Sequence, residues 1–164
     1  ATAVGEELLG IPDFGIPDFS EPLSQEKHVL KNLKKVFLMI AGAGVQKYGT
    51  ELESHQQILL AVADILIEIY LAESALLRAE KNVGTYGLEA QKHQVAMSQL
   101  YLYQATEKIC AKGREAILSF AEGDEQKALL MGLKRYTKYY EYPNIVGLRN
   151  LIAEKISAEN AYCF

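Results

Sequence analysis

The sequence is poor in cysteine, proline and glycine, and these shortages exclude some classes of protein. It contains two cysteines, four prolines and twelve glycines among 164 residues. Two thiols, Cys110 and Cys163, do not make the disulfide framework of a small secreted domain. We therefore expect a reducing, cytoplasmic setting. The small number of turn-forming residues favours helices over a turn-rich sheet.

The chain also lacks an excess of basic residues and any long apolar run. Lys and Arg total 17 against 21 for Asp and Glu, and the formal net charge of -4 argues against a nucleic-acid-binding surface. The longest nearly uncharged apolar run, from Val36 to Val45, is too short to span a membrane. The first ten residues hold neither Lys nor Arg and no hydrophobic segment, so they do not resemble a signal peptide. Because the chain begins at Ala1 without a methionine, we expect a piece of a longer protein or a processed one.

The composition is that of one globular domain, with 49% hydrophobic and 23% charged residues. Its N-terminal part repeats the pentapeptide Gly-Ile-Pro-Asp-Phe over residues 10–14 and 15–19. The prolines push the residues before them into extended conformations, and the glycines interrupt helices. We expect residues 1–21 to form an extended linker whose Ile and Phe side chains rest on a neighbouring surface. A docking motif for another domain is the alternative.

Residues 22–164 carry apolar residues at helical spacing, which predicts an all-α domain. Helices are expected over these segments: 22–48, 50–81, 88–121, Asp124 to before Pro143, and from Asn144 onward. The expected start signals are Ser20 with Pro22, the pair Thr50 and Glu53, Asp124, and Asn144. The expected breaks are Gly49 and the turn over 82–87.

Two of the expected helices have repeating apolar positions that should form the core. The helix over 88–121 has pairs every seven residues: Val95/Ala96, Leu102/Tyr103, Ile109/Cys110 and Ala116/Ile117. The helix over 50–81 has Ile58/Leu59, Val62, Ile65/Leu66, Ile69, Ala72 and Leu76/Leu77. A seven-residue period indicates an antiparallel partner at a shallow angle. We therefore predict an up-and-down antiparallel helical bundle of three long helices plus one or two shorter C-terminal helices.

The sequence gives no signature of a metal or catalytic site. None of His28, His55 and His93 follows an acidic residue by three positions, so the ferritin-like di-iron pattern is absent. Glu51 with His55, and Glu89 with His93, would each supply two metal ligands at most. No Cys-x-x-Cys, Gly-x-Ser-x-Gly, Walker or Gly-x-Gly-x-x-Gly motif occurs. We therefore expect no catalytic, cofactor-binding or metal-binding residue.

Several other polar and small residues have a structural interpretation. Asp64 and Glu68, four residues apart, are expected to form an ion-paired or solvated stripe, with acid–base chemistry as the alternative. Glu73 is expected to pair with Arg78 and Lys81 on the surface. Two sets of glycines have expected roles on helices: Gly42 and Gly44 in close approach of helices, and Gly113 in a kink.

Two clusters are candidates for an interface. The first helix carries Lys27, Lys31, Lys34 and Lys35 on one face, and this face either is solvated or contacts an anionic membrane or an acidic partner. Near the end of the fourth helix lie Tyr136, Tyr139, Tyr140 and Tyr142. This cluster either clamps the helix end onto the bundle or contacts another protein, because tyrosine offers a large contact area with a polar tip.

Two stretches resemble the C-terminal extension of a group of acyl-CoA dehydrogenases. They are KNLKKVF with AGAGVQKYG, within residues 31–49, and ADILIEIY with AESALLRAEK, within residues 63–81. The group includes Bacillus-type bacterial enzymes and the very-long-chain enzymes of mitochondria. The resemblance is most specific from Leu33 to Lys81 and looser toward the C-terminus.

The resemblance implies a non-catalytic accessory domain. In such enzymes FAD and the catalytic glutamate belong to a core of helical, β and helical domains, which this chain lacks. The parent would desaturate a fatty acyl-CoA between its α and β carbons, with FAD as cofactor, as in fatty acid β-oxidation. This domain would then bear on packing against the core domains, on a homo-oligomer such as a dimer, or on localisation, including peripheral membrane contact. A free-standing helical module that binds a protein or a membrane surface is the alternative.

Overall fold

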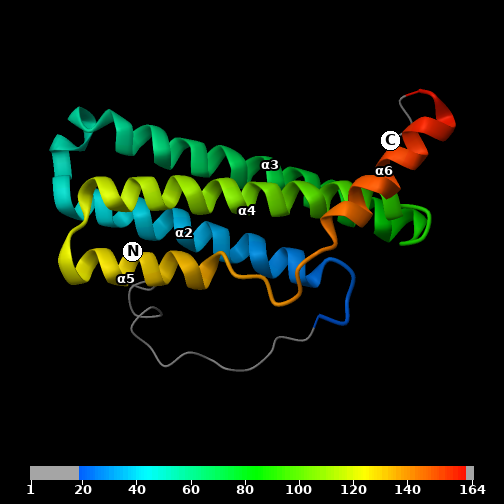
Figure 1. The fold of residues 1–164 in the computed structure, drawn as a ribbon, viewed down its shortest axis with the longest axis horizontal. Coiled ribbons are helices and arrows are strands. Elements are labelled where there is room, and N and C mark those ends of the chain that lie inside the picture. The colour runs from blue at the N-terminus through cyan, green and yellow to red at the C-terminus, as the bar shows by residue number, and fades with distance from the viewer. Residues whose placement is uncertain (1–18, 162–164) are drawn as a thin grey trace.

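The computed structural model describes residues 19–161, which form five α-helices and one 3-10 helix (Figure 1). The bounds are α2 Ser24–Tyr48, η1 Gly49–Ser54, α3 Gln56–Tyr86, α4 Lys92–Phe120, α5 Gly123–Tyr136 and α6 Ile145–Glu159. No strand occurs within these residues, so the all-α prediction is confirmed. Of the predicted linker over 1–21, only its last three residues lie inside the described part; the boundary at residue 21 stays a prediction.

The long helices lie side by side and alternate in direction (Figure 1). α2, α3 and α4 follow one another up and down, α5 returns beside α2 and α4, and α6 packs on α4 at one end and projects from the bundle. This arrangement confirms the predicted antiparallel bundle. In the described part of the chain, no helix has both the length and the apolar character that a membrane crossing needs.

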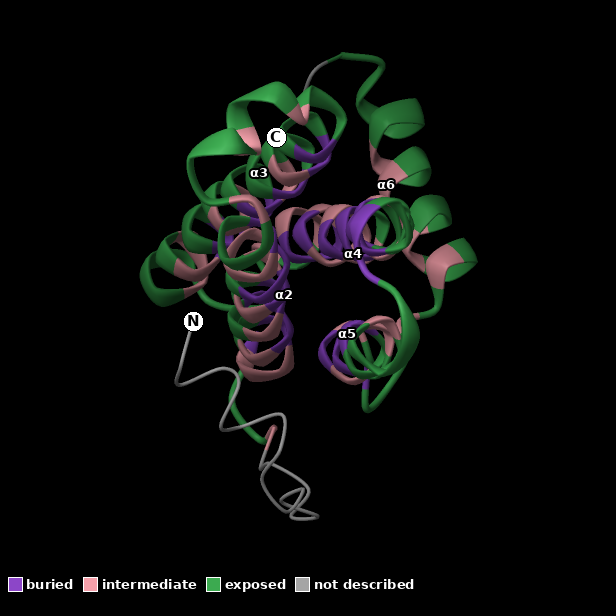
Figure 2. Ribbon diagram, turned by 90° about the vertical axis from the view of Figure 1, so that its left-hand side faces the viewer, coloured by how far each residue is buried: buried purple, intermediate pink, exposed green. Residues whose placement is uncertain are grey.

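The core lies where α2, α3, α4 and α5 turn their buried sides toward one another (Figure 2). Its fully buried large side chains include Leu33, Val36, Ile40, Ile65, Leu76, Leu102, Ile109, Ile117 and Leu133. The seven-residue pairs of α4 supply much of it, although Tyr103 and Cys110 are only half-buried. α6 contributes no buried residue, so the fifth predicted helix is present but lies outside the core.

The predicted core of α3 is wrong at three of its nine positions. Ile58, Ile65 and Leu76 are buried, but the second member of each pair faces water: Leu59, Leu66 and Leu77 are exposed. Neighbouring residues on a helix point about 100° apart, and only one stripe of α3 faces the other helices. The helix is therefore more apolar than the bundle alone requires.

Several predicted helix ends are also wrong. α2 follows Leu23, whose φ of 63° is left-handed, rather than a Ser20 cap. Thr50 and Glu53 lie within η1, and α3 begins after His55 with no side-chain cap. α3 continues through the predicted turn and ends at Tyr86, just before Gly87, whose φ is 85°. α4 begins at Lys92, four residues later than predicted. Packing outweighs the local turn signal here, because the extension of α3 beyond residue 81 places Val83 against the core.

Of three other predicted helix ends, those at Gly49 and Asn144 are confirmed and the cap at Asp124 is wrong. Gly49 ends α2, and its N–H donates to the Val45 carbonyl. Asn144 caps α6 by accepting a hydrogen bond from the Gly147 N–H at 3.0 Å. Asp124 does not cap α5, because Glu122 precedes the helix and Asp124 lies in its first turn.

Gly113 serves close packing rather than a break in α4, which continues through it. A Cβ added there would lie 3.0 Å from Cδ1 of both Ile40 in α2 and Leu133 in α5. At Gly44 the nearest atoms would be 3.8 Å away, in ordinary contact. The close-approach role predicted for Gly44 therefore belongs to Gly113.

Replacing these two glycines by alanine should change stability in opposite directions. Gly44→Ala should raise the free energy of unfolding by about 0.5–1 kcal/mol, since alanine loses less backbone entropy in a helix. Gly113→Ala should lower it by about 1 kcal/mol, because overpacking outweighs the same gain. Urea denaturation of both variants measures this; stabilisation by Gly113→Ala would contradict the packing assignment.

Aspartate substitutions at two nearby positions of α3 should distinguish its buried side from its exposed side. Ile65→Asp places an unpaired charge at a fully buried position and should cost about 4 kcal/mol or more, which unfolds the chain. Ile67→Asp is the matched control, because Ile67 is 54% exposed, and its melting temperature should stay near that of the wild type. Circular dichroism melting of the two variants tests this, and a folded Ile65→Asp chain would refute the core assignment.

Candidate interaction surface

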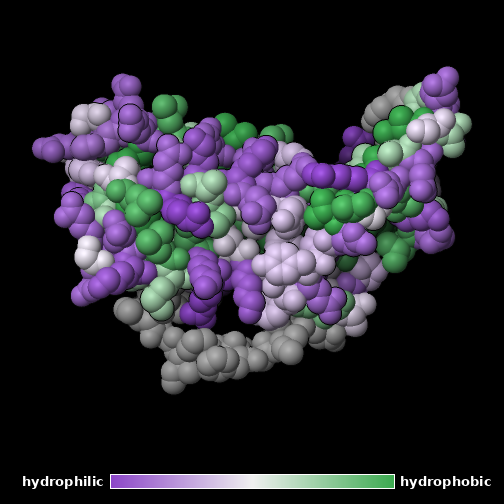
Figure 3. Space-filling model, viewed as in Figure 1, coloured by the Kyte–Doolittle hydropathy of each residue, from purple (hydrophilic) through white to green (hydrophobic). Residues whose placement is uncertain are grey.

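The side of α3 that points away from the bundle is apolar. It presents seven large hydrophobic side chains that are 39% to 68% exposed: Leu59, Leu60, Leu66, Ile67, Tyr70, Leu71 and Leu77. We call these seven residues the outer α3 face. Hydrophobic atoms line the upper edge of the molecule, where α3 lies (Figure 3). Monomeric soluble proteins rarely leave large contiguous apolar patches in water, so this face is a candidate binding surface.

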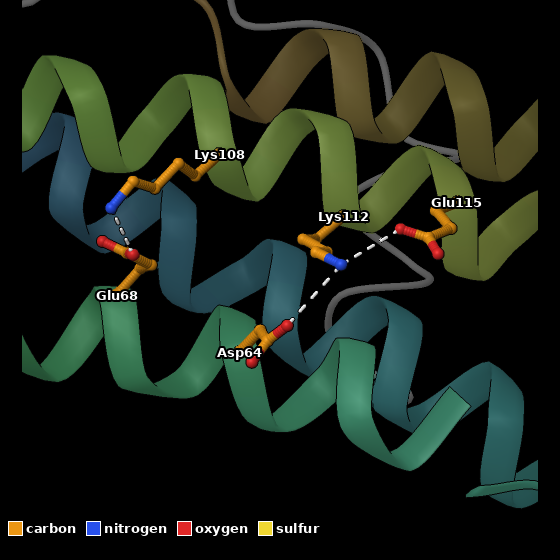
Figure 4. Close-up of polar contacts among 5 residues, drawn as sticks. All are labelled: Asp64, Glu68, Lys108, Lys112 and Glu115. Carbon is orange, nitrogen blue, oxygen red and sulfur yellow. Dashed lines mark hydrogen bonds and ion pairs between the residues drawn. The ribbon is translucent and has the colours of Figure 1, made fainter. Parts of the chain in front are cut away.

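One border of this face is a row of ion pairs to α4 (Figure 4). Lys108 Nζ lies 2.7 Å from Glu68 Oε1, and Lys112 Nζ lies 3.7 Å from Asp64 Oδ2 and 3.3 Å from Glu115 Oε2. Asp64 and Glu68 therefore form the ion-paired stripe that the sequence predicts. With a lysine on each, this pair lacks the shared burial that acid–base chemistry would need.

Tyr101 of α4 joins the same row. Its hydroxyl donates to Glu68 Oε2 at 3.0 Å. Burial, reinforced by this hydrogen bond to a carboxylate, raises the pKa of Tyr101 to about 12. The phenol thus stays protonated at neutral pH and acts as a donor that orients Glu68.

The other border of the outer α3 face is a row of ion pairs to α2. Lys27 Nζ lies 2.9 Å from Glu80 Oε1, and Lys34 Nζ lies 2.6 Å from Glu73 Oε1. Glu73 thus pairs across helices, and the predicted partners on its own helix are wrong. Each pair is at least partly exposed and is worth at most about 1 kcal/mol, so these pairs align the helices more than they stabilise them.

The four lysines proposed as an interface do not point the same way. Lys27 and Lys34 reach toward α3, whereas Lys35 Nζ lies 5.4 Å from the ring centroid of Tyr136 in α5. Lys31 is exposed. Most of this set is thus engaged within the bundle, and its role in contact with a membrane or partner stays a prediction.

The tyrosine cluster divides between the core and the surface. Tyr136 and Tyr139 are buried, and the Tyr139 hydroxyl lies 3.5 Å from Thr106 Oγ1. Burial raises the pKa of Tyr139 well above its usual value. Tyr140 and Tyr142 are exposed. The first pair fits the clamp interpretation. Contact of the second pair with another protein stays a prediction.

Phe19, His28 and Tyr140 form an aromatic cluster at the start of α2. Their ring centroids lie 5.8 Å apart for Phe19 and His28, 5.4 Å for Phe19 and Tyr140, and 5.7 Å for His28 and Tyr140. Phe19 ends the second pentapeptide, so this side chain rests on the bundle as the linker interpretation expects. The remaining residues of the repeat lie outside the described part.

Residues 32–135 match the family model of the "Acyl-CoA dehydrogenase, C-terminal domain". The chain belongs to this family. The predicted resemblance is therefore confirmed, both over residues 33–81, where it is most specific, and over part of the looser stretch that follows.

Relatives in two Bacillus species show how much of the whole protein this chain represents. The chain is 36% identical over 142 residues to a probable acyl-CoA dehydrogenase of Bacillus subtilis (strain 168), covering 84% of this chain and 23% of that protein. It superposes on the crystal structure of an acyl-CoA dehydrogenase complexed with FAD from Bacillus anthracis with a TM-score of 0.90 and 34% identity. That match covers 100% of this chain and 27% of the other. The chain thus spans about a quarter of the length of these relatives.

The grooves of the described part offer no catalytic constellation. Two grooves of about 300 and 350 Å³ lie along the α3–α4 seam, one beside Arg78 and Gln94 and the other over the Asp64–Lys112 ion pair. Residues 19–161 contain no group of three His, Cys, Asp or Glu side chains able to hold a metal ion. The outer α3 face is therefore the candidate interaction site in the described part of the chain. Three of its residues, Leu59, Leu66 and Leu77, were predicted as core.

Protonation of His28 should weaken the fold. Burial, together with the positive charges of Lys35 and Lys31, holds the pKa of His28 below 6.5. The unfolded chain therefore binds this proton more strongly, so stability is lost as the pH falls below about 6.5. We expect the urea midpoint to drop between pH 7 and pH 5.5.

The matched variant His28→Phe keeps an aromatic ring against Phe19 and Tyr140 but cannot titrate. It should show a smaller loss of stability over the same pH interval, with the remainder due to groups such as His93, whose pKa is also lowered. An identical pH dependence in both proteins would exclude His28 as a source.

Proposed function

We propose that this chain is the C-terminal accessory domain of an FAD-dependent acyl-CoA dehydrogenase that desaturates fatty acyl-CoA in fatty acid β-oxidation. The match of the whole chain to about a quarter of an FAD-bound relative carries this proposal. The domain itself is non-catalytic and serves packing, assembly or localisation of the parent. Its partners are the core domains of the parent, within a homo-oligomer such as a dimer.

The described residues do not fit FAD. A dinucleotide's pyrophosphate is commonly held by a glycine-rich loop at a helix start, and no helix start in residues 19–161 has that motif. One seam groove is bordered by the ion pairs of Glu68 with Lys108 and of Asp64 with Lys112. The other is lined by Arg78, by uncharged polar residues such as Gln94, and by apolar residues. We therefore propose that flavin binding and the reaction belong to the rest of the parent.

A free-standing binding module is the second candidate. The outer α3 face supports it, since an apolar helix surface can receive another protein. Lys31, Tyr140 and the lysine and tyrosine sets around them are further candidates for contact with a protein or an anionic membrane. The low cysteine content supports a cytoplasmic location for either candidate.

The intact gene product separates the two candidates. Its visible spectrum should show bound flavin, and it should oxidise acyl-CoA with an artificial electron acceptor. The 164-residue chain, assayed at the same molar concentration, should be colourless and inactive. A gene product without flavin, or one that consists of this chain alone, would refute the accessory-domain proposal and favour the binding module.

A further inference from the structure

The outer α3 face is a helix surface without a partner in the described structure. α3 buries Ile65, Ile69 and Leu76 on its inner side and exposes Leu60, Ile67 and other large apolar residues on its outer side. A surface helix of a globular protein typically has one apolar stripe, which faces the core, so a second apolar side on α3 indicates a further packing partner. The two rows of ion pairs to α2 and α4 separate the inner side from the outer side.

The spacing on this surface fits a second helix. Apolar or small residues recur at intervals of three and four along the stripe: Leu60, Ala63, Ile67, Tyr70, Ser74 and Leu77. This is the heptad spacing of a seam with a helix packed at a shallow angle. The small side chains of Ala63 and Ser74 allow the partner's backbone to approach closely between the larger residues.

The charged residues around the outer α3 face define an orientation for the helix that packs on it. The carboxylates that border the stripe are already paired with lysines of α2 and α4. At its C-terminal end the same face carries Arg78 and Lys81, both exposed and without an ion pair in the described part of the chain. An approaching helix would therefore meet apolar surface along its length and positive charge at one end.

We propose that a helix of the acyl-CoA dehydrogenase core packs along the outer α3 face, with a carboxylate facing Arg78 or Lys81. The inference rests on the proposed function and adds which surface of the domain is covered and by what. The core is the favoured occupant because the matched relatives are about four times as long as this chain. A segment of the same polypeptide is present at a high effective concentration, whereas a second copy must associate from solution.

Photo-cross-linking in the intact, flavin-containing enzyme tests the contact. Ile67→p-benzoyl-phenylalanine places the probe at the middle of the outer α3 face. Met131→p-benzoyl-phenylalanine is the control, because Met131 is 72% exposed and apolar but lies on α5. Mass spectrometry of the cross-linked peptides should identify a core helix from position 67 in at least tenfold greater yield than from position 131.

A second pair of variants controls for non-specific cross-linking. With the probe at Leu60, the further change Ile67→Asp should lower the yield to the same core helix about tenfold, whereas Ile67→Leu should leave it unchanged. An unaltered flavin spectrum in each variant shows that the core remains folded. An equal yield from Ile67→Asp and Ile67→Leu would overturn the proposal.

Two other outcomes would also overturn it. A cross-link from position 67 to α3 of another copy would show that the face joins copies of this chain. No cross-link from position 67 in a flavin-containing, active enzyme would show that the face stays in solvent. Both outcomes leave the accessory-domain function intact, since only loss of flavin binding or of dehydrogenase activity in the intact wild type contradicts that function.

Discussion

The rotational setting of α3 about its own axis determines most of what this domain presents to its surroundings. Ile65, Ile69 and Leu76 turn toward the core, and this places Glu68 beside Lys108 and Glu73 beside Lys34. The same setting leaves Ile67 and Tyr70 pointing outward. A rotation of α3 that buried these outer residues would expose the inner ones and separate both rows of ion pairs.

The hydrophobic contacts and the ion pairs contribute differently to this setting. Burial of a large aliphatic side chain stabilises the fold by about 1.5–3 kcal/mol, whereas an exposed ion pair contributes at most about 1 kcal/mol. The inner side therefore holds α3 in place. The ion pairs select among settings of similar packing, because carboxylates lie on both flanks of the helix and each has a lysine on a different neighbour.

Sequence periodicity predicted the helices and their antiparallel order, because it records which residues can share a helix face. The helix ends were harder to predict, because different local structures compete there. Thr50 and Glu53 have a capping pattern, yet the chain forms a 3-10 helix at these residues. The sequence also could not predict which charged residues pair across helices, as Glu73 does with Lys34. The outer α3 face was missed for a related reason, since the pair Leu76/Leu77 has the same pattern whether one member or both are buried.

That ambiguity has a physical meaning in this protein. A sequence pattern reflects every surface that a helix buries, including those covered by polypeptide outside the described chain. Here the bundle accounts for the inner side of α3 and leaves apolar residues such as Leu60 and Leu77 in water. Association through such a face loses translational and rotational freedom, but a covalent tether removes most of that loss. An apolar stripe too small to hold two free proteins together is therefore sufficient to fix a domain that is already attached to its partner.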